Sequence, residues 1–316
     1  MAECGSLDKK LLGLSRTVGA ARELVEEAAA TDTAVMLLGE PGTGKQLVAQ
    51  LIHESSGRAE EPFLMIDCSL YYERELKREL FGLGETANST RSRKGVFEFA
   101  SAGTCYLSHV EELSPALQAE LRQFLEEGTF RRLGDRECVT SGVRLVASSD
   151  KNLPGFVCSG LFEQALFDCL AGTLGQLAPL RERREDISAI VEEMQRAFLS
   201  GCERGSVPTF APETLRALEA YPWPLNVDEL KKEIKRLLET GSPQVTPESL
   251  SMEISSFWLG QSNDPEIRSV LEELEGYIRE FRIMSRLSGA FGQSVGFAGL
   301  EKEPSRSCFW DLTEEC

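Results

Sequence analysis

A glycine-rich stretch near the N-terminus has the residue types that bind phosphate. Residues 39–45 read Gly-Glu-Pro-Gly-Thr-Gly-Lys, after the apolar run 34–38 and before a segment whose apolar residues recur at helical spacing. In such a strand–loop–helix unit the glycines let backbone N–H groups turn towards one anion, and the helix N-terminus adds partial positive charge. Lys45 can reach the outer phosphates of a nucleotide. We predict a phosphate-binding loop here, with a plain structural turn as the alternative.

The predicted nucleotide contacts continue past the lysine into the following helix. Gln46 departs from the strict pattern, which places Ser or Thr there to contact Mg²⁺. The candidate nucleotide-binding residues in this segment are Gly39, Glu40, Pro41, Gly42, Thr43, Gly44, Lys45, Gln46 and Leu47.

The elements that must position this loop alternate between short apolar runs and helical patterns. A helix is predicted over 116–125, where apolar residues share one face. Strands are predicted at 34–38, 63–66, 104–107 and 143–147. This alternation continues to about residue 178 and is typical of a parallel α/β sheet, so we predict an α/β core over 1–178.

The pattern changes to helices only after residue 178, which predicts a smaller all-helical domain over 179–255. One helix is predicted from Asp186, Pro212 should occupy a first helical turn, and Asn226 should cap a further helix. Residues 256–316 are predicted to form an amphipathic helix and a flexible tail. That helix either binds a partner or docks onto its own protein.

Composition narrows the function classes. The 316 residues carry a formal net charge of −17, which opposes broad contact with nucleic acid. The nine cysteines include no Cys-x-x-Cys pair, which argues against a zinc site or a disulfide framework and for a reducing compartment. The sequence has neither an apolar run of membrane-spanning length nor an apolar N-terminal signal core, so we expect a cytoplasmic protein with no membrane contact.

Several further segments occur together with the glycine-rich loop. They are residues 39–45, 52–58, 79–82, 94–98, 103–104, 179–187 and 223–227. In this order and spacing, across residues 12–255, they resemble the AAA+ ATPase domain of the bacterial sigma-54-dependent transcriptional activators. The resemblance implies a P-loop AAA+ core, a helical lid over 179–255, and ring assembly with nucleotide between subunits. Leu12 and Gly13 match the family's adenine-side segment, although a Leu-Gly pair is also common for structural reasons.

The chain departs from the family where the third predicted strand ends. The family has an Asp–Glu pair there, which organises Mg²⁺ and orients the attacking water, whereas this chain has Ser108 and His109. A serine hydroxyl carries no charge to hold a hard divalent cation, so we expect weakened Mg²⁺ binding. His109 could act as a substitute base, or Glu111 or Glu112 could take over through a register shift. The alternative for both glutamates is a solvated position at a helix entry.

Other charge-bearing positions of the family are altered as well. Glu163 and Cys169 stand where the resemblance implies two arginines that reach a neighbouring subunit's nucleotide, and Asp228 stands where it implies a phosphate-sensing arginine. Ser149 and Asn152 fall in the family's polar sensor stretch, but they carry no positive charge. An arginine supplied to the terminal phosphate is worth roughly 10³–10⁵ in rate, so these changes predict weak or lost hydrolysis and a pseudoenzyme. We predict no catalytic residue and no bound structural metal.

The surfaces that would contact partners also differ. The family's sigma-54-contacting loop has an aromatic tip, whereas residues 83–90 are polar and contain no Phe. After residue 256 no second, basic recognition helix is recognisable, so direct DNA binding is not expected. A polar loop without an aromatic side chain cannot make the same apolar contact, so direct remodelling of sigma-54 is not expected either.

Three functions remain open from sequence. The first is an ATP- or ADP-binding module that regulates transcription through protein contacts, with AAA+ subunits or the transcription machinery as partners, in a homo- or hetero-oligomer. The second is an active ring-forming ATPase that remodels a transcription complex. The third is a nucleotide-free scaffold.

Overall fold

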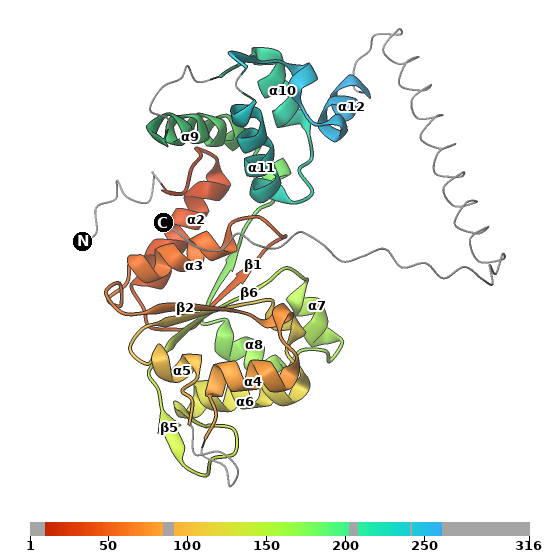
Figure 1. Cartoon of the computed structure of the whole chain (residues 1–316). Helices are drawn as coiled ribbons and strands as arrows, with labels where there is room; N and C mark the ends of the chain where they lie inside the picture. The colour runs from red at the N-terminus through yellow and green to blue at the C-terminus, as the bar shows by residue number, and fades with distance from the viewer. Residues whose placement is uncertain (1–9, 85–91, 202–207, 241, 261–316) are drawn as a thin grey trace, which may run out of the picture. The chain divides into compact units, whose positions relative to one another are not determined.

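A computed structural model of the chain describes residues 10–84, 92–201, 208–240 and 242–260 (Figure 1). The described residues up to Trp258 form one compact unit. Residues 261–316, which include most of the predicted amphipathic helix and tail, and residues 85–90 of the predicted polar loop lie outside the described residues.

A five-stranded parallel sheet with the order β2-β3-β6-β1-β7 forms the centre of the core. Its strands are β1 (Val35–Leu38), β2 (Phe63–Asp67), β3 (Thr104–Ser108), β6 (Arg144–Ser149) and β7 (Thr173–Gln176). Four of them confirm the predicted strands with ends shifted by one or two residues. The strand β7 was missed because its sequence Thr-Leu-Gly-Gln lacks an apolar run, as suits a strand at the sheet edge with one neighbour.

Helices cover both faces of this sheet (Figure 1). Those of the core are α2 (Arg16–Ala29), α3 (Lys45–Glu54), α4 (Glu73–Phe81), α5 (Val96–Phe99), α6 (Pro115–Glu127), α7 (Leu153–Cys158) and α8 (Gln164–Leu170). The predicted helix at 116–125 is confirmed as α6, and Ser114 caps it by accepting a hydrogen bond from the Leu117 N–H. An unpredicted hairpin pairs β4 (Thr129–Arg131) with β5 (Cys138–Thr140).

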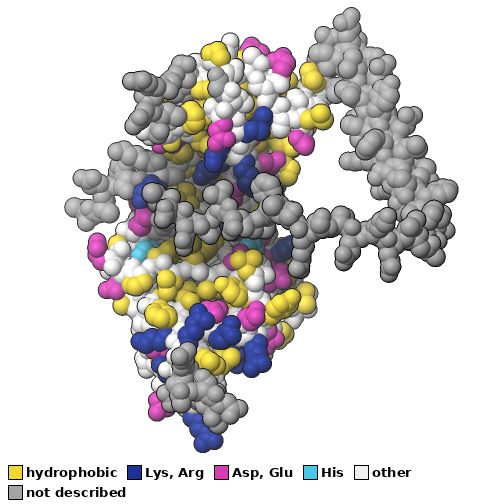
Figure 2. Space-filling view, viewed as in Figure 1, with side chains coloured by type: hydrophobic (Ala, Val, Ile, Leu, Met, Phe, Trp, Pro, Cys, Tyr) yellow, Lys and Arg dark blue, Asp and Glu magenta, His cyan; other side chains and the backbone are white. Residues whose placement is uncertain are grey.

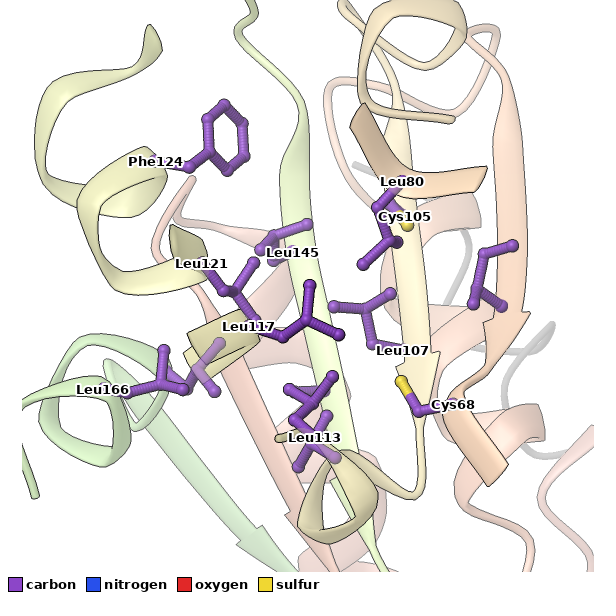
Figure 3. Packing of buried hydrophobic residues seen from close by; sticks show 14 of the residues in the cluster. Cys68, Leu80, Cys105, Leu107, Leu113, Leu117, Leu121, Phe124, Leu145 and Leu166 are labelled. Atoms are coloured by element: carbon purple, nitrogen blue, oxygen red, sulfur yellow. The ribbon is translucent and has the colours of Figure 1, made fainter. Parts of the chain in front are cut away.

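The strands send alternate side chains into two separate apolar clusters. In β3, Cys105 and Leu107 pack towards α6, whereas Tyr106 packs on the opposite face with residues of α2 and α3. Figure 3 shows the first cluster, in which Leu117, Leu121 and Phe124 of α6 lie against the strands, close to Leu145 of β6. A sheet buried on both faces in this way leaves its strand ends as the positions open to ligand.

A third apolar cluster lies in the part of the chain after residue 179. It is built by α9 (Asp186–Gly201), α10 (Pro212–Ala220), α11 (Asn226–Glu239) and α12 (Met252–Gly260), around the fully buried Trp223. Pro212 does occupy the first turn of α10, as predicted. The all-helical prediction was wrong in one detail, because β8 (Thr209–Phe210) pairs with β9 (Gln244–Val245). Two-residue strands are too short to produce a periodic sequence pattern.

The division at residues 178 and 255 stays a prediction. None of the helices in the described ranges combines the length and the apolar character needed to cross a membrane.

Candidate functional site

The glycine-rich loop lies between β1 and α3 and curls around its own lysine. Gly44, at the start of α3, has a left-handed backbone with φ +102°, and Lys45 is the first helical residue. The Lys45 ammonium donates hydrogen bonds to the carbonyl oxygens of Gly39 at 2.8 Å and Glu40 at 2.9 Å. The Thr43 hydroxyl also donates to the Glu40 carbonyl, at 2.9 Å. These bonds hold the loop in one conformation around a buried cation.

A cavity of about 540 Å³ opens beside this loop, a size suited to a small ligand. Leu12, Gly42, Lys45 and most of the other predicted nucleotide residues line it. The predicted residues in the lining are Leu12, Pro41, Gly42, Thr43, Gly44, Lys45, Gln46 and Leu47. Gly13, Gly39 and Glu40 are not among the lining residues.

These three residues instead have structural contacts. The Gly39 carbonyl accepts from Lys45. The Glu40 carboxylate forms a double hydrogen bond with the Arg181 guanidinium at 2.5 and 2.6 Å, which lowers the pKa of that carboxyl. Gly13 has φ +125°, and a Cβ atom there would lie 2.4 Å from the Asp186 carboxylate. Close approach to Asp186 therefore explains this glycine without any ligand.

Asn226 connects the helical segment to the glycine-rich loop through hydrogen bonds. Its side-chain oxygen accepts from the Leu180 N–H at 2.7 Å, and its amide donates to the Pro41 carbonyl at 2.9 Å and the Glu40 carboxylate at 3.3 Å. The prediction that Asn226 caps a helix was wrong, because it is already the first residue of α11, with φ +53°, and its polar atoms serve the loop. Next to it, the Val227 N–H donates to the Gly42 carbonyl at 2.9 Å.

Four charged side chains meet along the end of the sheet that faces the cavity. The Lys45 ammonium lies 2.6 Å from Asp150 Oδ1, and Asp150 Oδ2 lies 3.2 Å from His109 Nε2. The other ring nitrogen of His109, Nδ1, lies 2.8 Å from Asp67 Oδ1. Burial by itself lowers the pKa of His109, but the hydrogen bond to Asp67 and the charges of Asp67, Asp150 and Glu111 outweigh it, so the net direction is upward.

Sequence reasoning missed two of these four residues. Asp67 is the last residue of β2, and Asp150 directly follows β6. The signal that could have found both is an acidic residue at the end of a predicted strand. The carboxyl ends of parallel strands meet at one edge of the sheet, where ligands bind. Further missed cations in the lining are Lys10, Arg183 and Lys231. Arg183 donates to the Thr43 carbonyl at 3.0 Å, and its Nε is buried without a partner among the described residues.

With this geometry established, comparison with known proteins identifies the family. Residues 11–173 match the family described as the Sigma-54 interaction domain, and residues 181–263 match the AAA+ ATPase lid domain. The chain belongs to the Sigma-54 interaction domain family. Its core is therefore a P-loop AAA+ core, and its mostly helical part is an AAA+ lid.

Relatives of this Sigma-54 interaction domain protein are regulatory proteins by name. The Nif-specific regulatory protein of Bradyrhizobium diazoefficiens is 37% identical over 72% of this chain and 39% of the relative. The transcriptional regulatory protein ZraR of Escherichia coli is 32% identical over 83% of this chain and 61% of the relative. This chain thus spans less than two thirds of the length of these relatives.

Solved structures give the same likeness. NtrX from Brucella abortus in complex with ATP matches with a TM-score of 0.74 and 28% identity, over 83% of this chain and 61% of NtrX. NtrX in complex with ADP matches with a TM-score of 0.73, over 85% of this chain and 63% of NtrX.

Within this family fold, the position of Glu111 contradicts the solvated role suggested from sequence. Glu111 lies in the short 3-10 helix Val110–Glu112 and is 9% exposed. One carboxylate oxygen accepts from the Asp150 N–H at 3.3 Å, and the other is buried without a partner among the described residues. It was misjudged because the short 3-10 helix that follows β3 turns this acid inward. Glu112 is exposed, as expected.

Glu163 and Asp228, which stand where the resemblance implies arginines, each have a basic side chain in their surroundings. Glu163 does not present an isolated negative charge, because the Arg122 Nε of α6 donates to its carboxylate at 2.8 Å. Asp228 lines the cavity, and so does Lys231, three residues later on α11 and therefore on a similar helix face. The lid thus brings one acid, Asp228, and two cations, Arg183 and Lys231, to the cavity.

A second cavity, of about 910 Å³, lies between α4 and the β4–β5 hairpin. Figure 2 shows Lys and Arg side chains gathered over this side of the core. Much of that charge is already paired, because Lys77 contacts Glu120, and Arg132 donates to Glu98 at 3.0 Å. We therefore interpret this surface as a set of local ion pairs.

Proposed function

We propose that this chain binds ATP or ADP in the cavity beside Lys45 and regulates transcription through protein contacts, with weak or lost hydrolysis. Nucleotide binding is supported by the left-handed Gly44 turn, by the N-terminus of α3 and by the buried Lys45. The Arg183 Nε, which has no partner among the described residues, and the neighbouring Lys231 add donors and positive charge suited to a polyphosphate. The complexes of NtrX with ATP and ADP support the same ligand class.

The proposal of weak hydrolysis depends on one observation, which is that both ring nitrogens of His109 contact carboxylates. Both of its ring nitrogens face carboxylate oxygens, at 2.8 and 3.2 Å, so neither is free to accept a proton from an attacking water. Ser108 next to it carries no charge. This geometry argues against His109 as a substitute base, which the sequence left open.

The proposed partners are AAA+ subunits or the transcription machinery, in a homo- or hetero-oligomer in the cytoplasm. The names of the relatives support a role in transcription, and the net charge of −17 supports contact with protein rather than with DNA. A pull-down from cytoplasmic extract with and without ATP tests this part of the proposal.

A nucleotide titration tests the binding proposal. Fluorescent ATP and ADP are titrated into the native chain, into Lys45→Ala and into Lys235→Ala. The last is a matched control, because Lys235 is a 72% exposed lysine of α11 that does not line the cavity. Loss of binding in Lys45→Ala alone is expected. Equal signals from all three proteins would favour the nucleotide-free scaffold.

A phosphate-release assay tests the hydrolysis proposal. Steady-state release is measured across a range of protein concentrations, so that any assembly-dependent turnover is detected. Little release above background is expected at every concentration. Robust turnover that Lys45→Ala abolishes would instead establish an active ring-forming ATPase.

A further inference from the structure

Alternating charges run across four neighbouring strands at the cavity end of the sheet. In the sheet order β2-β3-β6-β1, the strands lead into Asp67, His109, Asp150 and Lys45 in turn. The three contacts between successive members measure 2.8, 3.2 and 2.6 Å. All four residues line the cavity. We call this set the charge ladder.

The geometry of the ladder specifies the protonation state of His109. A neutral imidazole has one N–H donor and one nitrogen lone pair. Here both ring nitrogens face carboxylate oxygens, so a neutral ring would direct a lone pair at one of them. Only the imidazolium donates to Asp67 and Asp150 together. The nearby acid Glu111 and the ammonium Lys45 are the other charged groups facing this assembly.

The balance of charge in the ladder depends on that imidazolium. Lys45 and His109 carry two positive charges, and they face three carboxylates, those of Asp67 and Asp150 and that of the neighbouring Glu111. Without the charge on His109 the ladder would be net negative and would repel the phosphates of a nucleotide. With it, the cavity keeps the attraction of Arg183 and Lys231 for a polyanion, whereas the charge of Lys10 is paired with Glu54 at 2.5 Å.

A divalent metal fits this donor set poorly. Ser108 offers a neutral hydroxyl at the strand end. The carboxylates of Asp67 and Asp150 are already bonded to His109, which leaves one buried oxygen of Glu111 as the remaining anionic donor, and a hard divalent cation needs several. A metal ion placed among them would also lie close to a fixed positive charge. The family resemblance implies Mg²⁺ at this position, and the residues of this chain disagree with it.

We propose that His109 takes the place of the divalent cation, so that this chain binds the phosphates of ATP or ADP without Mg²⁺. This inference rests on the proposed function, because it assumes that nucleotide occupies the cavity. The ligand class is the metal-free nucleoside di- or triphosphate. His109 acts as a positioning cation and not as a catalytic residue.

Calorimetric titration of the full chain with ATP and ADP, once in EDTA and once in excess Mg²⁺, tests the inference. The native chain should bind with similar affinity in both conditions. His109→Asn removes the charge, and Asn tolerates the left-handed backbone of this position, where φ is +55°. That variant should lose about tenfold or more of its metal-free affinity and should regain part of it with Mg²⁺. His109→Lys should retain metal-free binding, because it keeps the positive charge.

The outcomes separate this inference from the function on which it rests. Binding that depends on both Lys45 and Mg²⁺ would leave the proposed function standing and overturn the metal-free inference. Equal metal-free affinities for the native chain and His109→Asn would overturn it as well. If the native chain binds no nucleotide in either buffer, the proposed function and this inference both fall. Thermal melts of each variant establish that it is folded before binding is compared.

Discussion

The carbonyl oxygen of Leu225 occupies the space where a side chain on Gly42 would begin. A Cβ atom on Gly42 would lie 2.1 Å from that oxygen, and the Gly42 backbone is left-handed, with φ +73°. The Gly42 carbonyl in turn accepts from the Val227 N–H. A glycine predicted to approach phosphate therefore also permits the lid backbone to lie directly on the loop.

Gly42→Ala should separate the lid from the loop. The added methyl group cannot be accommodated without moving Leu225, so we expect a loss of about 2 kcal/mol or more in the free energy of unfolding. Urea unfolding measures it. Gly19→Ala is the control, because Gly19 lies within α2 with open space around it and should be neutral or stabilising by up to about 1 kcal/mol. Equal stability of Gly42→Ala and the native chain would contradict the contact.

Asn226→Ala should also destabilise the chain. The substitution leaves the buried Leu180 N–H and the Pro41 carbonyl without their partners, at a cost of about 2–3 kcal/mol. Chemical denaturation measures the change. Asn226→Asp should cost less, because its carboxylate can still accept from Leu180. If the alanine variant were no less stable than the aspartate variant, the bridging role of Asn226 would be wrong.

The Asp186 carboxylate should stabilise the segment directly before α2, at Leu14 and Ser15. Its carboxylate accepts from the N–H groups of Leu14 at 2.8 Å and Ser15 at 2.9 Å, and from the Ser15 hydroxyl at 2.5 Å. Asp186→Ala should lower the free energy of unfolding by about 3 kcal/mol, whereas Asp186→Asn should retain part of the bonding. Hydrogen exchange at the Leu14 and Ser15 amides provides the local readout. Unchanged exchange in Asp186→Ala would refute this role.

The charge ladder should make stability depend on pH through His109. The pKa of His109 is raised above its usual value of 6.5, so its contribution is complete below about pH 6.5 and is lost as pH rises through the folded-state value. The difference in unfolding free energy between the native chain and His109→Asn should therefore be larger at about pH 6 than at about pH 9. A constant difference would show that His109 is not protonated in the folded chain.

The double variant Ser108→Asp/His109→Glu should change metal binding without creating a fast enzyme. Two carboxylates at the end of β3 provide the charge that a divalent cation needs, so nucleotide binding should become stronger with Mg²⁺. Phosphate release should stay slow, because Glu163 remains bonded to Arg122 and Cys169 supplies no positive charge. Rapid release from this variant would show that the arginine positions do not limit hydrolysis.

The sequence alone located the glycine-rich loop, four of the five sheet strands and the altered charges at Ser108, Glu163 and Asp228. These features are local, because a glycine pattern, an apolar run or a residue type can be recognised without knowing its neighbours in space. Only the tertiary structure placed Asp67, His109 and Asp150 beside one another, because their adjacency arises from the strand order β2-β3-β6-β1. The inward turn of Glu111 and the contact between Asn226 and the loop were likewise decided by packing between segments far apart in the chain, which no periodic pattern records.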